Sequence, residues 1–178
     1  MSLKLYDANR CPYCARARIG LAEKGLEYET VTIDLSNRPA WLYELNPIGK
    51  VPVLDDDGFI LPESEVILGY LDERFPERPL LPVPPRERAA ARLAVYRFDD
   101  LLGDEYYAFR RGDRNALSER LESLELGQSL FTDACFAPWV IRAREMLGVR
   151  LPARLDAQLE ELLERPAFAA ELAIVRAL

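Results

Sequence analysis

Histidine is absent from this sequence, and its absence removes several kinds of catalytic and metal site. Ser-His-Asp and Cys-His catalysis both need an imidazole as general base, and many metal centres need it as a ligand. Cys11 and Cys14 have the spacing of half a zinc site, but only Cys135 remains to complete it, in an apolar helical stretch. We therefore expect no metal, and we expect Cys135 to pack in the core.

Long hydrophobic runs and an excess of basic charge are also missing. No apolar run approaches the roughly 20 residues of a membrane-spanning helix, and the first residues lack the pattern of a secretory signal. The formal net charge is −7, whereas a DNA- or RNA-binding surface needs a basic patch. We expect no membrane and no nucleic-acid partner. Three cysteines without a secretory signal indicate the reducing cytoplasm.

The first half of the chain alternates strand and helix. The expected elements are, in order, a strand over 3–6, a helix over 12–24, a strand over 28–33, a short helical segment over 38–45, a hairpin of strands 51–54 and 59–61, and a helix over 63–75. The first three make a βαβ unit, so their two strands should run parallel. In the last helix, Val66 and Ile67 begin an apolar stripe that should pack against the sheet.

A proline-rich segment separates this half from an all-helical one. Residues 76–85 hold five of the 13 prolines and can form neither a helix nor a central strand. We therefore divide the chain into a domain over 1–76, a linker over 77–85 and a helical domain over 86–178. The helices expected in the last part cover 86–111, 115–126, 132–147, 152–163 and 167–177.

Cys11 stands where a strand gives way to a helix, and this position can hold thiol chemistry. Pro12 at the first helical position costs no hydrogen bond, and the free N–H groups of the first turn point towards the sulfur. A helix N-terminus stabilises an exposed charge by about 0.3–1 kcal/mol, which lowers a thiol pKa by less than about one unit. The N–H groups of Tyr13 and Cys14, the Cys14 thiol or Arg10 must supply the rest of the shift.

The motif and its surroundings resemble a known family. Cys11-Pro12-Tyr13-Cys14 is identical to the glutaredoxin active-site tetrapeptide, and residues 1–75 resemble the thioredoxin-fold N-terminal domain of the glutathione transferase superfamily. Further support comes from residues 46–54, 63–67 and 70–75. The linker and helical half resemble the C-terminal domain of the superfamily. The fold class implied is an α/β thioredoxin-like domain followed by an all-α domain.

In the thioredoxin-like fold that the resemblance implies, the residue before the proline, Val51, presents a free backbone edge. An X–Pro bond adopts the cis form at a cost of only about 0.5–1 kcal/mol, and a cis Val51–Pro52 bond would turn the backbone edge of Val51 towards the cysteine. A short peptide such as glutathione could pair with that edge as an added strand.

The resemblance assigns the two ends of glutathione. It implies that Glu63 and Ser64 hold the γ-glutamyl amino and carboxylate groups, although the same pair could simply cap a helix. Arg38 stands where omega-like transferases place a lysine near the glycine carboxylate, and Lys50 is a second candidate for that carboxylate. Glutathione would be a co-substrate, shared with a small electrophilic or disulfide substrate, and the superfamily implies a homodimer.

Three chemistries remain open. Cys11 alone can form a mixed disulfide with glutathione, as in omega-like transferases, or Cys14 can resolve that disulfide, as in dithiol glutaredoxins. Transferases that rely on a hydroxyl would use Tyr6 instead, which could equally be a core residue. We favour glutathione-dependent thiol transfer or disulfide reduction, with the Cys11 thiolate as nucleophile.

A non-enzymatic alternative also comes from resemblance. Residues 70–83 resemble stringent starvation protein A, an adaptor that has the transferase fold and binds RNA polymerase. The helical half is shorter than the superfamily usually shows. Its usual Ser/Thr-x-x-Asp capping box is also altered, because Asp133 matches but Leu130 occupies the serine position, with Ser129 one residue away. Because the helical half is short, a pocket for a second substrate is less strongly expected than the glutathione site.

Overall fold

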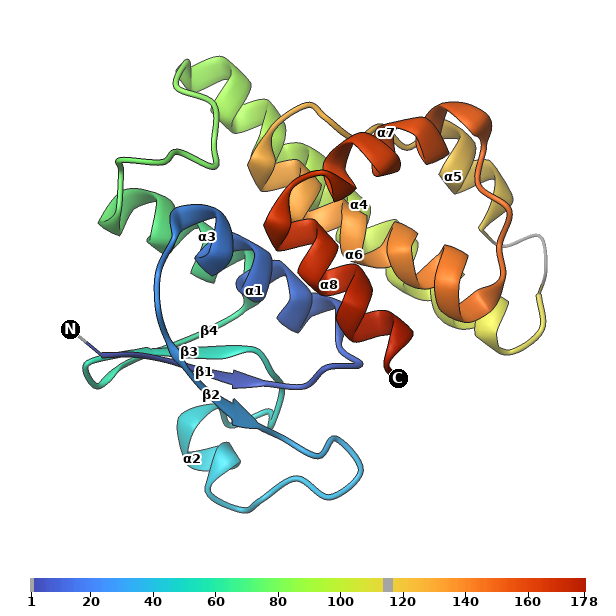
Figure 1. The fold of residues 1–178 in the computed structure, drawn as a ribbon. Helices are drawn as coiled ribbons and strands as arrows, with labels where there is room; N and C mark the ends of the chain where they lie inside the picture. Colours follow the sequence, from blue (N-terminus) through green and yellow to red (C-terminus); the bar gives the residue numbers. More distant parts are fainter. Residues whose placement is uncertain (1, 114–116) are drawn as a thin grey trace.

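The computed structural model describes residues 2–113 and 117–178, with backbone only for 100–103, 118 and 119 (Figure 1). The first half contains β1 (Leu3–Asp7), α1 (Pro12–Lys24), β2 (Glu29–Thr32), α2 (Leu42–Leu45), β3 (Val53–Asp56), β4 (Phe59–Pro62) and α3 (Ser64–Arg74). The second half contains α4 (Pro85–Arg110), α5 (Ser118–Ser123), α6 (Leu130–Leu147), α7 (Ala153–Leu163) and α8 (Pro166–Arg176). No described helix is both long and apolar enough to cross a membrane.

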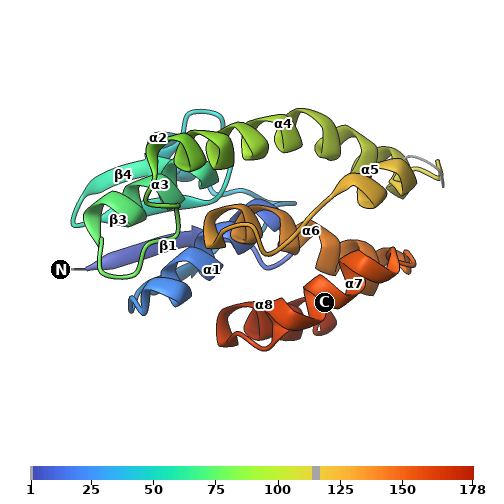
Figure 2. The same cartoon turned by 90° about the horizontal axis from the view of Figure 1, so that it is seen from above.

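The four strands form one sheet in the order β2-β1-β3-β4. β1 and β2 run parallel, as the βαβ pattern predicts, whereas β3 pairs antiparallel with both β1 and β4. Helices α1 and α3 lie on one face of the sheet, between it and the helical half, and α2 lies on the other face (Figures 1 and 2). The end of β1 therefore delivers the chain to the junction between the two halves.

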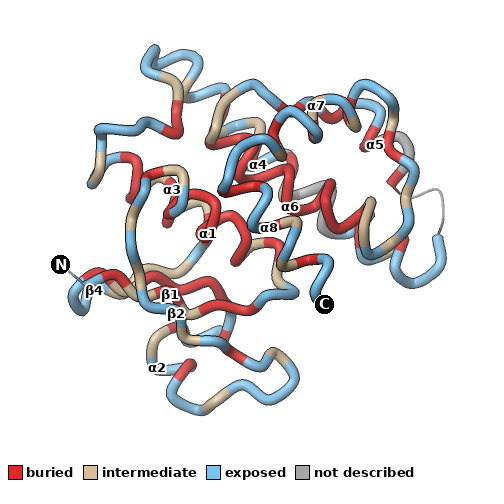
Figure 3. Tube along the Cα trace, viewed as in Figure 1, coloured by how far each residue is buried: buried red, intermediate tan, exposed pale blue. Residues whose placement is uncertain are grey.

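Helix α1 is the central element of the molecule, buried between the sheet and the helical half (Figure 3). Its start and end are those predicted, because Pro12 presets the first turn and Gly25 ends the helix in the left-handed conformation at φ 68°. Three of its buried side chains are cationic, and each is paired: Arg16 with Asp99, Arg18 with Asp7 and Glu171, and Lys24 with Asp72.

The proline-rich segment is fixed to the first half by Asp72. The carboxylate of Asp72 accepts hydrogen bonds from Lys24 Nζ at 2.8 Å and from the Leu80 N–H at 2.6 Å. Leu80 and Leu81 are buried, while most of the surrounding segment is exposed. The segment is thus an ordered connection, with two leucines anchoring it in the core that the halves share.

Helix α6 runs through the core of the helical half and begins earlier than predicted. Ser129 is its N-cap, and its hydroxyl oxygen accepts a hydrogen bond from the Thr132 N–H at 3.2 Å. Asp133, one turn in, accepts from the Gly127 N–H at 2.7 Å. The capping function is therefore kept by Ser129 although the expected spacing is not, because the Asp133 carboxylate reaches the preceding loop instead of the cap residue.

Three details of the sequence analysis need correction. Val66 is 52% exposed, so the apolar stripe of α3 is narrower than predicted, and Leu68 packs instead into the core of the helical half. The turn between β3 and β4 is shorter than predicted, because β3 extends to Asp56 instead of ending at residue 54. The helix predicted over 115–126 is shorter at Ser118–Ser123, and part of its predicted start lies outside the described residues.

Candidate active site

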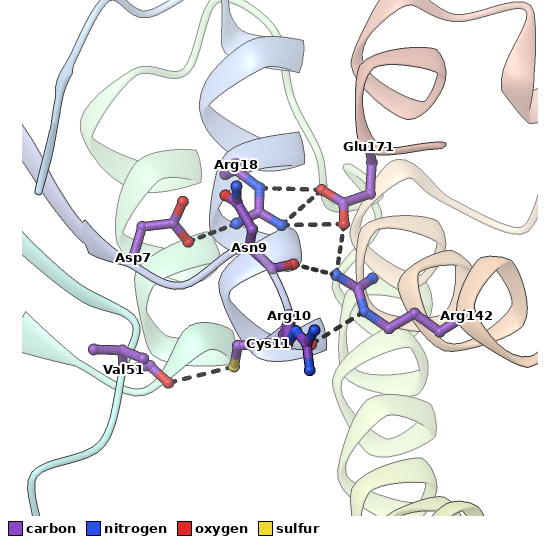
Figure 4. A network of polar contacts seen from close by, with 8 residues as sticks. All are labelled: Asp7, Asn9, Arg10, Cys11, Arg18, Val51, Arg142 and Glu171. Carbon is purple, nitrogen blue, oxygen red and sulfur yellow. Dashed lines mark hydrogen bonds and ion pairs between the residues drawn. The ribbon is translucent and has the colours of Figure 1, made fainter. Parts of the chain in front are cut away.

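Cys11 is the N-cap residue of α1, immediately after the loop that follows β1. Its backbone is extended, at φ −81° and ψ 119°, and its side chain is half-buried. The thiol donates to the carbonyl oxygen of Val51 over 3.8 Å (Figure 4). The Val51–Pro52 bond is cis, and the structure brings this backbone edge to the cysteine, as expected from the sequence.

The surroundings of Cys11 lower the pKa of its thiol to about 7. The largest cause is a hydrogen bond from the Cys14 side chain, and burial opposes it by disfavouring the charged form. The N–H groups of Cys14 and Tyr13 and the positive charge of Arg142 lower the pKa further. About half of Cys11 is therefore thiolate at neutral pH, which the helix alone could not achieve.

Cys14 differs sharply from Cys11, although only two residues separate them. Its side chain is fully buried, and burial raises the pKa of its thiol well above the usual range. The hydrogen bond to Cys11 and the negative charges of Cys11 and Asp7 act in the same direction. Cys14 is therefore a protonated donor to the Cys11 sulfur at neutral pH, and it is not positioned as a solvent-accessible nucleophile.

Glu63 and Ser64 lie at the start of α3. Glu63 is exposed at φ 71° and ψ 114°, a backbone conformation that residues with a Cβ rarely adopt and that is often found at functional sites. Within residues 2–113 and 117–178, neither the Glu63 carboxylate nor the Ser64 hydroxyl has a hydrogen-bond partner. Glu63 gives no side-chain cap to α3, so simple helix capping does not account for it.

Arg38 and Lys50 are both exposed cations on the segments that flank α2. Neither side chain has an ion-pair or hydrogen-bond partner in the described part of the chain, so both are free to meet a carboxylate from solution. Lys50 directly precedes Val51, and its carbonyl oxygen accepts from Asn46 Nδ2 at 3.0 Å. This contact fixes the backbone beside the cis bond.

Tyrosines surround the cysteine on both sides, but they are poor candidates for the activating hydroxyl. The Tyr6 ring packs against Trp41, with centroids 5.7 Å apart, and belongs to the small cluster that contains Cys11 and Cys14. Tyr13 packs edge-on against Trp139, and its burial raises the pKa of its phenol to about 12. Tyr13 is therefore neutral, and the structure favours the thiol over a phenol as the ionised group.

Sequence reasoning missed Arg142, which contacts the active-site loop from the helical half. It is 1% exposed, and its Nη2 donates to the Asn9 carbonyl oxygen at 2.9 Å and to Glu171 at 2.8 Å (Figure 4). The sequence offers Arg10 as one possible source of the pKa shift, but the cation that lowers the pKa of Cys11 is Arg142. The one signal in the sequence was a charged residue inside the apolar run Val140-Ile141-Arg142-Ala143.

A separate cavity of about 750 Å³ lies between α4, α5 and α6. Ala91, Ala94, Phe98 and Phe136 form much of its wall. It contains none of the residues that the sequence assigned to glutathione, so it is not part of the site around Cys11.

Comparisons with known proteins agree with this architecture. The family described as glutathione S-transferase, N-terminal domain, matches residues 5–79. A stringent starvation protein A homolog of Coxiella burnetii is 32% identical over 191 aligned positions, which cover 96% of this chain and 91% of that protein. This chain belongs to the glutathione S-transferase superfamily.

Members of the superfamily with different names resemble the chain comparably. Glutathione S-transferase omega-1 of Mus musculus is 34% identical over 125 residues, covering 68% of this chain and 52% of the mouse protein. The crystal structure of glutathione transferase Omega 1C from Trametes versicolor has a TM-score of 0.83 at 26% identity, and the match covers 99% of this chain and 94% of that one.

The fold class predicted from the sequence is confirmed, with a thioredoxin-like first domain and a helical second one. The chain spans about half the length of several curated relatives that it matches, including the mouse protein.

Proposed function

We propose that this protein is a glutathione-dependent thiol transferase or disulfide reductase that uses Cys11 as its nucleophile. The observation that carries the proposal is the ionisation of Cys11, whose pKa of about 7 makes about half of it thiolate at neutral pH. Cys11 is half-buried beside the Val51 carbonyl, at an edge where an extended peptide can pair. An omega-class relative and an omega-class structure among the similar proteins support this chemistry.

Glutathione would bind in the orientation that the superfamily implies. Its cysteinyl part would pair with the backbone of Val51 before the cis Pro52. Its γ-glutamyl end would meet Glu63 and Ser64, whose polar groups have no other partner among the described residues. The glycine carboxylate would meet Arg38 or Lys50, the two exposed cations that flank α2. These assignments remain predictions.

The reaction we propose proceeds through one cysteine. The Cys11 thiolate attacks the glutathione sulfur of a mixed disulfide, forming a Cys11–glutathione disulfide and releasing the substrate as a thiolate. A second glutathione thiolate then attacks that disulfide, giving oxidised glutathione and restoring Cys11. Cys14 does not resolve the intermediate, because it is fully buried and protonated. Its role is to donate a hydrogen bond that stabilises the Cys11 thiolate.

The proposal is tested by measuring the reduction, by reduced glutathione, of a mixed disulfide between glutathione and a small thiol. Cys11→Ser should abolish turnover, while Cys14→Ser, which keeps a hydrogen-bond donor at the same position, should retain most of it. Turnover that is unchanged in Cys11→Ser would contradict the proposal. Turnover that is lost equally in both variants would replace the single-cysteine route with the dithiol one.

The adaptor function is the second candidate, and two observations favour it. One relative that matches nearly the whole chain is named a stringent starvation protein A homolog, and the proline-rich segment is largely exposed. Retention on immobilised glutathione favours the enzyme. Co-purification of RNA polymerase together with failure to bind glutathione would favour the adaptor.

We also propose a homodimer in the cytoplasm. Phe59 on β4, Val66 on α3, and Leu93 and Tyr96 on α4 are large hydrophobic side chains that are about half exposed or more. Exposed large hydrophobic side chains that gather on one face are typical of a protein interface, and we propose that these four do so. Sedimentation at micromolar concentration should show two copies, and a Leu93→Glu variant should sediment as a monomer.

A further inference from the structure

A buried chain of alternating charges links the two halves of the molecule behind Cys11. It consists of Asp7 at the end of β1, Arg18 on α1, Glu171 on α8 and Arg142 on α6 (Figure 4). Arg18 binds the Glu171 carboxylate through Nε at 3.0 Å and Nη2 at 2.8 Å, and Arg142 Nη2 binds it at 2.8 Å. Two anions and two cations balance, which allows all four to be buried.

Arg142 is the member of this chain that reaches the active-site loop. Its Nη2 donates to the carbonyl oxygen of Asn9 at 2.9 Å, and its Nε donates to the carbonyl oxygen of Arg10 at 3.4 Å. Its Nη1 donates to the carbonyl oxygen of Pro138, one turn back on its own helix, at 3.0 Å. These contacts fix the guanidinium from several directions, and they hold the two residues that immediately precede Cys11.

The groups that face Cys11 come from several elements. Cys14 and the N–H groups of Tyr13 and Cys14 belong to α1, the Val51 carbonyl belongs to the segment before β3, and Arg142 belongs to α6. Asp7 acts on neighbouring Cys14 from β1. Among the described residues, Arg142 is therefore the cation whose charge acts on the Cys11 sulfur, and it comes from the other half of the molecule.

We propose that Arg142 is a positioning residue for Cys11, holding the loop that carries it and placing a fixed positive charge near its sulfur. The proposal rests on the function proposed above, in which Cys11 reacts as a thiolate. Glu171 holds Arg142 in place and also neutralises part of its charge. The helical half thereby contributes to thiol activation as well as to packing.

A purely structural role predicts a different outcome from this one. If the network only stabilises the fold, removing Arg142 or Glu171 should lower stability and leave the ionisation of Cys11 unchanged. If Arg142 acts on Cys11, a variant of Arg142 and a variant of Glu171 should differ in the ionisation of Cys11. Arg142→Gln removes a charge that favours the thiolate, whereas Glu171→Gln leaves the charge of Arg142 less compensated, with the carbonyl contacts still holding it.

The test is the rate of Cys11 alkylation by iodoacetamide against pH, read by mass spectrometry of the Cys11 peptide, at a temperature where each variant is folded. Arg142→Gln should lower the rate at pH 6.5 about three- to eightfold, the loss that a pKa increase of roughly half to one unit gives. Arg142→Lys should regain at least half of the lost rate, because the charge is kept. Glu171→Gln should react as fast as the wild type or faster, despite lower stability.

Arg144→Gln is the matched control. Arg144 lies on the same helix and also pairs with carboxylates, those of Glu145, Asp156 and Glu160, but it makes no described contact with the active-site loop. Its alkylation profile should match the wild type. An unchanged profile in Arg142→Gln, an equal shift in Arg144→Gln, or a failure of Arg142→Lys to regain rate would overturn the proposal.

The readout contains no glutathione, so it separates this proposal from the proposed function. A shifted profile in a protein that never reacts with oxidised glutathione would preserve the role of Arg142 and remove the proposed function.

Discussion

The thiol of Cys14 is fully buried and donates a hydrogen bond to the sulfur of Cys11. This relationship gives the two cysteines of one motif opposite properties, since the pKa of Cys11 is lowered and that of Cys14 is raised. A motif that in sequence suggests a redox pair therefore has, in this structure, the geometry of one reactive thiolate with one supporting donor.

The pH dependence of thiol reactivity should follow from this arrangement. Alkylation of Cys11 should reach half its maximal rate near pH 7, because the thiolate is the reacting form. Cys14→Ala removes the largest cause of the lowered pKa and should move the midpoint upwards by about one unit. Cys14→Ser keeps a donor and should move it less. An equal shift in both variants would show that the hydrogen bond is not the cause.

Substitution of Glu63 should separate glutathione binding from stability. Glycine adopts positive φ freely, so Glu63→Gly should leave the free energy of unfolding unchanged or raise it by about 1 kcal/mol, while it removes the carboxylate. Retention on immobilised glutathione should fall at least about tenfold, the effect of losing about 1.4 kcal/mol of binding. Glu77→Ala, at an exposed position in the linker, is the control and should be retained normally.

Asp133 should make stability fall as pH rises. Burial raises the pKa of its carboxyl to about 6, so the folded protein holds a proton that the unfolded chain has already released between about pH 4 and 6. The contribution is therefore most favourable below pH 4 and is lost above pH 6.

Denaturant unfolding of Asp133→Asn should show that the ionised Asp133 carboxylate lowers the stability of the wild type as pH rises. The variant should be more stable than the wild type at pH 7.5, by at most about 3 kcal/mol, with the difference vanishing near pH 4. Asp104→Asn, at an exposed position on α4, should show no such dependence. A variant less stable than the wild type at pH 7.5 would mean that the hydrogen bond from Gly127 outweighs burial.

The anchor of the proline-rich segment should be a large contributor to stability. Asp72→Ala leaves the Lys24 charge buried and unpaired and leaves the Leu80 N–H without its acceptor, which should cost about 3–5 kcal/mol. Glu73→Ala is the matched control one residue away, because its exposed pair with Arg92 should be worth about 0–1 kcal/mol. Denaturant unfolding measures both, and similar losses would contradict the assignment.

Local patterns in the sequence were sufficient for most of the first half. Pro12 and Gly25 fix the ends of α1, and the βαβ spacing fixes the parallel pair of strands, because each depends on neighbouring residues only. Val66 was predicted to be buried because it belongs to an apolar stripe at helical spacing. Its exposure depends instead on which helices pack on α3.

The long-range part of the site could not be predicted in this way. Arg142 and Asn9 are 133 positions apart, and nothing in their local sequence links them. The role of Ser129 as a cap was obscured for a different reason, since the alignment to a family motif fixed a spacing that the helix start does not follow. Cys11, Val51 and Glu63 could be proposed as site residues from the sequence because they stand in recognisable motifs.

Mass spectrometry after incubation with oxidised glutathione at pH 7 shows directly whether Cys11 is the thiol that reacts with glutathione. We expect one glutathione per chain, located on Cys11, in the wild type and in Cys14→Ser, and none in Cys11→Ser. An intramolecular Cys11–Cys14 disulfide as the main wild-type product, or no adduct on Cys11 at all, would contradict it.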